Sequence, residues 1–455
     1  MTAADGPRGS STGVVPRGVA LAVLRRVERD HAYADVALNA ALAESTLDAR
    51  DRALAARLVY GTLAWQGRLD WHLARLAARP VDALDPELRS ILRLGLYQLL
   101  LLDRIPAHAA VATSVELAKG AAPAAAGLVN AVLRRAAREG KALPLPDAAN
   151  TVRHLAVAYS HPEWLVARWL DAFGPNETRR LLAADNEAAP TVVRARLGGR
   201  DRLLADFAAQ GVDATPARYA PDAVVVDSAA PQLLAGHARG DFVVQSEASQ
   251  LVARLLDPPP GTRVLDACAA PGGKATYLAE LAGDGGLVLA CDVRPRRAST
   301  IAAVARRLGI ARLTVAAADA RYPPLAPDTK FDRILVDAPC TGLGTLRAHP
   351  EVRWSRTPAD VHRLAALQAE ILGAVTPHLV HGGALVYATC TISPEENEQV
   401  VDRWLARHPE LERENAAKLL PPAAAAFVDA DGALRTLPHR DGLDGFYAVR
   451  VRRRT

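Results

Sequence analysis

The spacing of apolar positions changes along this chain and divides it into three stretches. From residue 16 to residue 143, apolar residues recur three and four positions apart, as at Leu88, Ile91 and Leu92. This spacing gives a helix one apolar face, and prolines interrupt it at intervals that suit helix ends. We therefore predict an all-helical domain over residues 16–143.

Residues 150–250 mix helical and strand-like spacing, after a linker marked by Pro144 and Pro146. The predicted segments are helices at 164–173, 177–184 and 200–209, and strands at 191–195 and 223–226. This mixture predicts a small α+β module in this part of the chain.

From residue 251 onward, apolar strands alternate with helices. Strands are predicted at 262–268, 286–292, 313–319, 331–338 and 383–390, and helices at 273–282, 295–308 and 360–380. Strands that are apolar on both sides predict a mostly parallel sheet with helices on both faces. Strand candidates around the turn-rich segment 439–445 predict a C-terminal antiparallel hairpin.

The length and charge of the chain indicate a multidomain protein that tolerates a polyanionic partner. Its 455 residues exceed one core, since domains hold roughly 100–200 residues. The net charge of +5 and the arginine cluster at 450–454 permit such a partner without proving one. Residues 1–15 are polar and rich in Gly, Pro and Ser, which predicts a disordered tail.

The apolar runs and the cysteines bear on where the protein works. The most apolar run, 94–102, is too short to span a bilayer, and the N-terminus lacks the apolar core of a signal peptide. The 4 cysteines form no CxxC pair and no zinc spacing, which predicts reduced thiols and no metal site. We expect a cytoplasmic monomer without membrane association.

The carboxyl ends of the predicted parallel strands are where a sheet of this kind binds ligands. Each of these ends carries an acid or a thiol: Asp266, Asp292, Asp319, Asp337 with Cys340, and Cys390. Gly272 and Gly273 follow the first strand and let the backbone approach a ligand beside a helix N-terminus. Asp292 comes about 20 residues later, a spacing at which an acid binds ribose hydroxyls.

These strand ends predict a site for a nucleoside cofactor, with Asp319 as an acceptor for an adenine amino group. The chain has neither GxGxxG nor GxxxxGK[ST], which argues against NAD and ATP. The alternatives are a glycine pair that only turns the chain and an Asp319 that only caps a helix.

Cys340 and Cys390 stand at the ends of the fourth and fifth strands, where loops carry accessible side chains. The alternative is that both are incidental small residues, as we interpret Cys268 and Cys291 to be structural. A thiolate that adds to C6 of a pyrimidine makes C5 nucleophilic toward a methyl donor. An acid that protonates N3 assists this addition.

Three motifs carry a resemblance to a known family. DACAAPGGK at 266–274, DAPCTGLGTLRAHPEVRW at 337–354 and YATCTISPEENEQVV at 387–401 resemble the RsmB/Nop2/Sun family of RNA 5-methylcytosine methyltransferases. The resemblance implies a Rossmann-like class I methyltransferase domain over 251–455 that uses S-adenosyl-L-methionine. The cofactor-binding residues it implies are Cys268, Ala269, Ala270, Pro271, Gly272, Gly273, Lys274, Asp292, Asp319 and Asp337.

The same resemblance implies a role for each reactive side chain. Cys390 is expected to be the nucleophile, Cys340 to assist product release, and Asp337 to sit beside the target base and activate it. The residues alone leave open which thiol attacks, because a Pro-Cys thiol is the nucleophile in other pyrimidine-C5 methyltransferases.

The rest of the chain resembles RNA-binding modules of the same family. Residues 33–42, 58–73, 92–119 and 127–135 resemble a NusB-like domain, and 150–250 resembles an RRM-like region. The expected partner is RNA, with 16S rRNA as substrate and rRNA (cytosine-C5-)-methyltransferase as activity. Alternatives are the same chemistry on tRNA, or a non-catalytic RNA-binding assembly factor. Candidate RNA contacts, unless they only form a solvated basic face, are Arg104, His108, Arg134 and Arg135.

Overall fold

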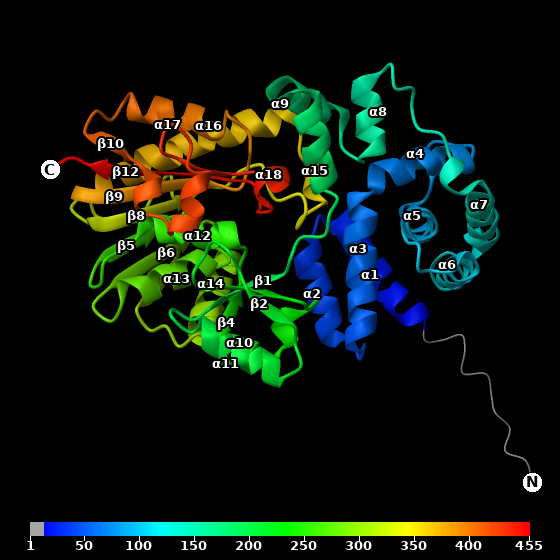
Figure 1. Cartoon of the computed structure of the whole chain (residues 1–455), viewed down its shortest axis with the longest axis horizontal. Coiled ribbons are helices and arrows are strands. Elements are labelled where there is room, and N and C mark those ends of the chain that lie inside the picture. The colour runs from blue at the N-terminus through cyan, green and yellow to red at the C-terminus, as the bar shows by residue number, and fades with distance from the viewer. Residues whose placement is uncertain (1–12) are drawn as a thin grey trace, which may run out of the picture. The chain divides into compact units, whose positions relative to one another are not determined.

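The computed structural model describes residues 13–455, which form two compact units (Figure 1). The first unit runs to Ala188 and also contains Leu346–Ser355. The second unit contains Ala189–Thr345 and Arg356–Thr455. The first helix begins at Val14, and most of the tail predicted for residues 1–15 lies outside the described residues.

The first unit is helical where the apolar spacing predicts helices. Its α-helices are α1 (Val14–Asp30), α2 (Ala34–Glu44), α3 (Ala49–Ala64), α4 (Gln66–Leu76), α5 (Pro86–Leu101), α6 (Ala107–Ala121), α7 (Ala126–Glu139), α8 (Thr151–Ala158), α9 (Glu163–Ala184) and α15 (Val352–Ser355). Ile91 and Leu92 on α5 are fully buried. Gly174, with a φ of 71°, interrupts α9 between the two helices predicted there. Within residues 13–455, no helix is both long and apolar enough to cross a bilayer.

A small antiparallel sheet opens the second unit. Its strands are β1 (Val192–Ala195), β2 (Ala214–Pro216), β3 (Ala223–Val226) and β4 (Phe242–Val244), in the order β2-β3-β1-β4. Phe207 of α10 (Arg200–Ala209) packs against Val193, Val224 and Phe242 of this sheet. The α+β character is as predicted, whereas β2 and β4 are too short to show a period in the sequence. The short helix α11 (Ala235–Arg239) leads into β4.

The larger sheet has the strand order β10-β12-β9-β8-β5-β6-β7, with β11 also paired to β12. Its strands are β5 (Arg263–Asp266), β6 (Leu287–Asp292), β7 (Leu313–Ala317), β8 (Phe331–Asp337), β9 (Leu379–Thr389), β10 (Leu411–Glu414), β11 (Leu434–Thr436) and β12 (Phe446–Arg453). The pairs among β5 to β9 are parallel, and β10, β11 and β12 pair antiparallel. The predicted parallel sheet and its C-terminal hairpin are confirmed.

Helices cover both faces of this sheet, which explains why its strands are apolar on both sides (Figure 1). On one face lie α12 (Glu247–Leu256), α13 (Gly273–Ala282) and α14 (Pro295–Arg307), and on the other α16 (Pro358–Val375) and α17 (Glu398–Leu405). Val264 and Leu335 pack with Leu278 in one core, and the next residue along β5, Leu265, packs in the core of α16.

Two boundaries differ from those expected. The helix predicted at 360–380 ends at Val375, because Pro377 lies in a 3-10 turn and β9 begins at Leu379. β10 was not predicted, because its sequence Leu-Glu-Arg-Glu has one apolar residue and no apolar alternation. The short helix α18 (Pro438–Asp441) occupies the turn-rich segment before β12.

Candidate active site

The ends of β8 and β9 bring the two predicted thiols together. Asp337 and Ala388 are register partners in this parallel pair, so the loops that follow the two strands leave the sheet side by side. The Sγ atoms of Cys340 and Cys390 lie 3.3 Å apart, and both residues are partly exposed. Residues 50 positions apart in sequence therefore share one site.

A buried carboxylate fastens the two cysteine loops to each other. Oε1 of Glu396 accepts the backbone N–H of Thr341 at 2.8 Å, and its Oε2 accepts the Thr341 hydroxyl at 2.5 Å. The Thr341 hydroxyl also lies 2.8 Å from that of Thr391. Each threonine follows one of the cysteines, and all three side chains are inaccessible to solvent. Glu396 thus holds the positions next to both sulfurs.

Further hydrogen bonds fix the backbone around Cys390. The carbonyl of Cys390 accepts the N–H of Gly344 at 3.0 Å. Asn397 donates from Nδ2 to the carbonyl of Thr391 at 3.0 Å and accepts the Thr389 hydroxyl at 2.6 Å. The residues on either side of the thiol are therefore bound to one side chain, which limits its movement.

The sulfur contact affects the ionisation of Cys340. The contact with the Cys390 sulfur, followed by burial, raises the pKa of Cys340 well above its usual value. Cys340 is therefore a neutral thiol at neutral pH, poorly suited to attack. Burial also raises the pKa of Cys268 well above its usual value and that of Cys291 to about 11. These two thiols are equally unsuited to nucleophilic attack.

An ion pair lies beside the thiol pair. Nζ of Lys274, on the first turn of α13, is 2.8 Å from Oδ2 of Asp337. Burial is the largest single effect and opposes the charge of Lys274, but the charge and hydrogen bond of Asp337, with smaller contributions from nearby groups, together raise the pKa of the amine above its usual value. The predicted acid at the end of β8 is thus held by a cation from the predicted cofactor loop.

Asp266, at the end of β5, is fully buried. Among the residues that the structure describes, the backbone N–H of Cys268 is the one group that approaches its carboxyl oxygens as a hydrogen-bond donor, and it does so with poor geometry. Burial, with a further contribution from the charge of Asp337, raises the pKa of Asp266 to about 8. A carboxyl group in this state has unused capacity to accept hydrogen bonds from a cationic ligand.

The glycine turn between β5 and α13 has no room for a side chain. Gly272 has a φ of 111°, and a Cβ atom there would lie 3.1 Å from the Cα of Ile301. The free N–H groups at the start of α13 follow it directly. This turn and the buried Asp266 fit the carboxylate and ammonium groups of an amino-acid moiety such as that of S-adenosylmethionine.

The other two predicted cofactor acids lie at the ends of β6 and β7. Asp292 is 5% exposed, and its Oδ1 accepts the N–H of Arg294 at 3.0 Å. Asp319 pairs with Arg321 at 2.7 Å, and that hydrogen bond lowers the pKa of Asp319. The Asp319 carboxylate is therefore already bound by Arg321, and an adenine amino group would have to share this carboxylate with the arginine.

A largely apolar cavity of about 120 Å³ adjoins Asp319. Its lining residues are Leu265, Ala267, Leu289, Cys291, Ala316, Ala318, Asp319, Ala320, Pro323, Pro324, Leu325 and Val375. The chain between β7 and β8 forms no helix, so a loop rather than a helix closes this part of the sheet. Its position beside the predicted adenine acceptor suits part of an aromatic base.

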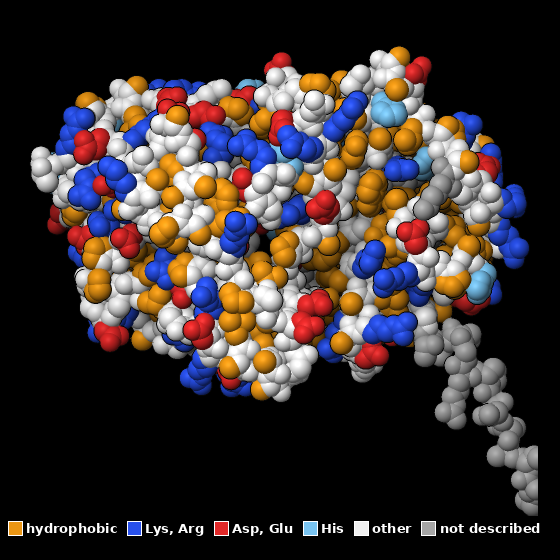
Figure 2. Space-filling view, viewed as in Figure 1, with side chains coloured by type: hydrophobic (Ala, Val, Ile, Leu, Met, Phe, Trp, Pro, Cys, Tyr) orange, Lys and Arg blue, Asp and Glu red, His pale blue; other side chains and the backbone are white. Residues whose placement is uncertain are grey.

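The candidate RNA contacts lie on the first unit and are polar and mostly exposed. His108 and Arg134 line a groove of about 450 Å³ between α6 and α7, whereas Arg135 pairs with Glu139. Arg104 is exposed on the loop before α6. Basic and acidic side chains are interspersed over the face in Figure 2, which fits a solvated surface as well as an RNA contact.

Comparisons with known proteins match successive parts of the chain to family models. The 16S rRNA methyltransferase RsmB/F family matches residues 253–452, the NusB family matches 15–138, and the ferredoxin-like domain of RsmF/B-like methyltransferases matches 161–232.

Individual relatives extend over nearly the whole chain. A probable ribosomal RNA small subunit methyltransferase B of Bacillus subtilis is 37% identical over 96% of this chain and 98% of its own length. The ribosomal RNA small subunit methyltransferase B of Pseudomonas putida is 40% identical over 89% of this chain and 91% of its own. The crystal structure of PH0851 superposes with a TM-score of 0.83 at 25% identity, covering 99% of this chain and 100% of that chain.

Proposed function

Because this chain belongs to the 16S rRNA methyltransferase RsmB/F family, we propose that it methylates C5 of a cytidine in small-subunit rRNA. The observation that carries this proposal is the pair of sulfurs 3.3 Å apart beside the ion pair of Asp337 and Lys274. C5 of cytosine is a poor nucleophile, and a thiol with an adjacent acid is the equipment that activates it.

The proposed reaction begins with the Cys390 thiolate, which forms a bond to C6 of the base. The C5–C6 π electrons then shift through C4 to N3, and N3 takes a proton that the Asp337 carboxylate relays from the ammonium group of Lys274. Lys274 holds one oxygen of Asp337 at 2.8 Å and leaves the other for the base. This addition turns C5 into an enamine-like nucleophile.

When bound, S-adenosylmethionine would supply the electrophilic methyl group that C5 takes up, and S-adenosylhomocysteine would be left. The C5 proton must then leave to a base, and the electron pair of that bond expels the Cys390 sulfur. We assign assistance in this release to Cys340, whose sulfur lies 3.3 Å from that of Cys390.

Replacing each thiol tests the proposed activity. Small-subunit rRNA from a strain that lacks the protein is incubated with S-adenosylmethionine carrying a labelled methyl group. Nucleoside mass spectrometry then identifies the product. The wild-type protein should form 5-methylcytidine, and Cys390→Ala should abolish turnover while RNA binding persists. Turnover by purified Cys390→Ala would refute the assignment of Cys390 as the nucleophile.

The same assay separates the alternatives. When tRNA is added to the assay, incorporation of the label into tRNA but not into rRNA would identify tRNA as the substrate of the same reaction. RNA binding without methyl transfer by the wild-type protein would favour a non-catalytic assembly factor. A labelled product other than 5-methylcytidine would overturn the cytosine-C5 assignment.

A further inference from the structure

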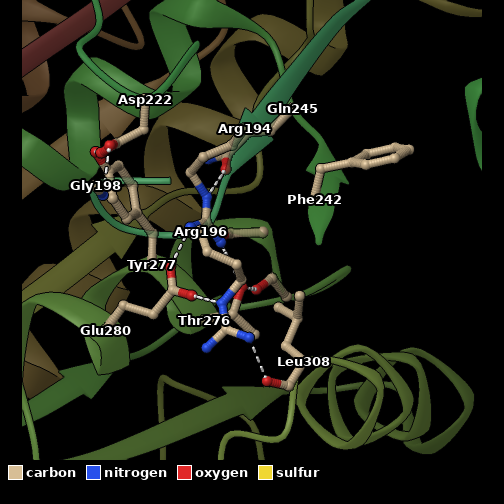
Figure 3. Close-up of polar contacts among 12 residues, drawn as sticks. Arg194, Arg196, Gly198, Asp222, Phe242, Gln245, Thr276, Tyr277, Glu280 and Leu308 are labelled. Carbon is tan, nitrogen blue, oxygen red and sulfur yellow. Dashed lines mark hydrogen bonds and ion pairs between the residues drawn. The ribbon is translucent and has the colours of Figure 1, made fainter. Parts of the chain in front are cut away.

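A buried arginine joins the small sheet to helix α13 (Figure 3). Arg194 on β1 is 1% exposed, and its Nε donates to Oε1 of Gln245 at 2.9 Å. One terminal nitrogen donates to the Thr276 hydroxyl at 3.1 Å, and the other pairs with Glu280. Thr276 and Glu280 lie on successive turns of the same face of α13.

The contact with Thr276 continues to the glycine turn. The Thr276 hydroxyl donates to the carbonyl of Gly272 at 2.8 Å and lies 3.1 Å from that of Gly273. The Gln245 side chain, the other partner of Arg194, would be 3.4 Å from a Cβ atom at Gly273. A hydrogen-bonded route therefore leads from Arg194 through Thr276 to the turn that precedes α13, and the Gln245 side chain lies beside the same turn.

A second buried cluster holds the next residue of α13. Oδ2 of Asp222, in the loop before β3, accepts the Tyr277 hydroxyl at 2.5 Å and pairs with Arg254 at 2.5 Å. The Arg194 guanidinium carbon lies 4.3 Å from the centre of the Tyr277 ring. The small sheet thus contacts α13 through charged groups rather than through an apolar surface alone.

Stability alone does not explain this arrangement. Desolvation of buried charges offsets most of their attraction, and apolar side chains of similar volume are often as stable in their place. What buried polar groups with several fixed partners do provide is a defined position. Here, the buried polar groups around Arg194 fix the position of the glycine turn.

We propose that Arg194 is a positioning residue for the cofactor turn: through Thr276 it orients Gly272 and Gly273. The inference rests on the proposed function, in which this turn binds S-adenosylmethionine. The small sheet is then part of the cofactor site as well as a module of the fold. Arg194 itself is buried behind the turn and acts through Thr276 and Gln245.

Calorimetric titration of the full chain with S-adenosylhomocysteine tests this role without requiring turnover. Arg194→Met should weaken binding about tenfold, the effect of one charge-assisted hydrogen bond. Thr276→Val should weaken it comparably, and the double variant should be no weaker than either single one. At saturating S-adenosylmethionine, kcat should stay near the wild-type value.

Arg196→Met is the matched control. Arg196 also pairs with Glu280, but its side chain is 43% exposed and its other partner is the carbonyl of Leu308. Its loss should change the dissociation constant by less than about twofold. Thermal unfolding monitors the fold of each variant, and Thr276→Val carries the test if Arg194→Met does not fold.

Wild-type affinity in Arg194→Met or in Thr276→Val, or additive effects in the double variant, would overturn the positioning role alone. A wild-type protein that binds neither S-adenosylmethionine nor S-adenosylhomocysteine would overturn the proposed cofactor together with this inference. The two failures are therefore distinguishable in one series of titrations.

Discussion

Asp266 is the acid that the strand ends bury most completely, and its protonation links the site to pH. Its folded-state pKa of about 8 lies above the ordinary value of 3.8, so the folded chain holds this proton more tightly than the unfolded chain. The stability that the proton contributes is complete below about pH 4 and is lost as pH rises toward 8.

Asp266→Asn should remove this pH dependence in the cofactor-free protein. The unfolding free energy of the variant relative to wild type should rise from pH 4 to pH 8 by up to about 1.4 kcal/mol per pH unit, then level off. Urea unfolding across this range measures it. Asp284→Asn, at an exposed turn after α13, is the control; parallel profiles for Asp266→Asn and wild type would contradict the assigned pKa.

The positions of single residues of the candidate site were predictable where a motif or a strand end marks them, whereas their roles stay predictions. Asp337, Cys340 and Cys390 follow apolar strands, and the parallel register then brings them together. The pairing of Lys274 with Asp337 and the complete burial of Asp266 were not predictable. They depend on the register between β5 and β8 and on burial, which no local pattern reports.

At the scale of elements, the loops after β8 and β9 act as a pair because Glu396, in the loop after β9, accepts two hydrogen bonds from Thr341 in the loop after β8. Sequence reasoning missed this residue, since a glutamate in a polar loop predicts a solvated side chain. The structure buries it completely and gives it donors from Thr341 and from Gln368, the latter at 3.2 Å. Burial is the largest effect on its carboxyl group and raises its pKa.

Glu396→Ala should separate the two cysteine loops. The donors of Thr341 and Gln368 lose their acceptor, at a cost of about 1–3 kcal/mol each where they stay unpaired. A mild oxidant that joins neighbouring thiols reports the distance: the Cys340–Cys390 disulfide should form about tenfold more slowly in the variant. Glu398→Ala, which removes a pair with Arg435, should leave the rate unchanged. Equal rates in all three proteins would contradict the role of Glu396.

The C-terminal arginines form ion pairs within the sheet, which the composition of the chain cannot reveal. The cluster at 450–454 permits a polyanionic partner, yet in β12 Arg450 is 2% exposed and pairs with Glu414 of β10. Arg452 also pairs with Glu414, and Arg454 with Glu412. The glutamates that make β10 too polar to be predicted as a strand are the partners of these arginines.

At the scale of the whole molecule, the chain divides where its sequence shows no boundary. Helices α8 and α9 group with the first unit, whereas the matched ferredoxin-like domain, residues 161–232, joins α9 to the strands at 191–195 and 223–226. The module expected over 150–250 stays a prediction. Leu346–Ser355, shortly after Cys340, also belongs to the first unit. Contacts between distant segments decide such divisions, and periodicity reports only neighbours along the chain.

Arg353 shows what holds that segment in the first unit. It is fully buried and donates to the carbonyl of Asp185 at 2.8 Å, to Oδ1 of Asn186 at 2.8 Å and to the carbonyl of Ser160 at 3.1 Å. Burial lowers its pKa to about 10, so it keeps its charge at neutral pH.

The monomeric state expected from the sequence stays a prediction.

A transient bond between the sulfur of Cys390 and C6 of a cytosine in RNA is the step on which the proposed function depends. Cys340→Ala, incubated with labelled small-subunit rRNA and S-adenosylmethionine and then denatured in detergent, tests it most directly. We predict a protein–RNA adduct that survives denaturation and disappears in the Cys340→Ala, Cys390→Ala double variant. An adduct that persists without Cys390, or normal turnover by Cys340→Ala with no adduct, would contradict the account.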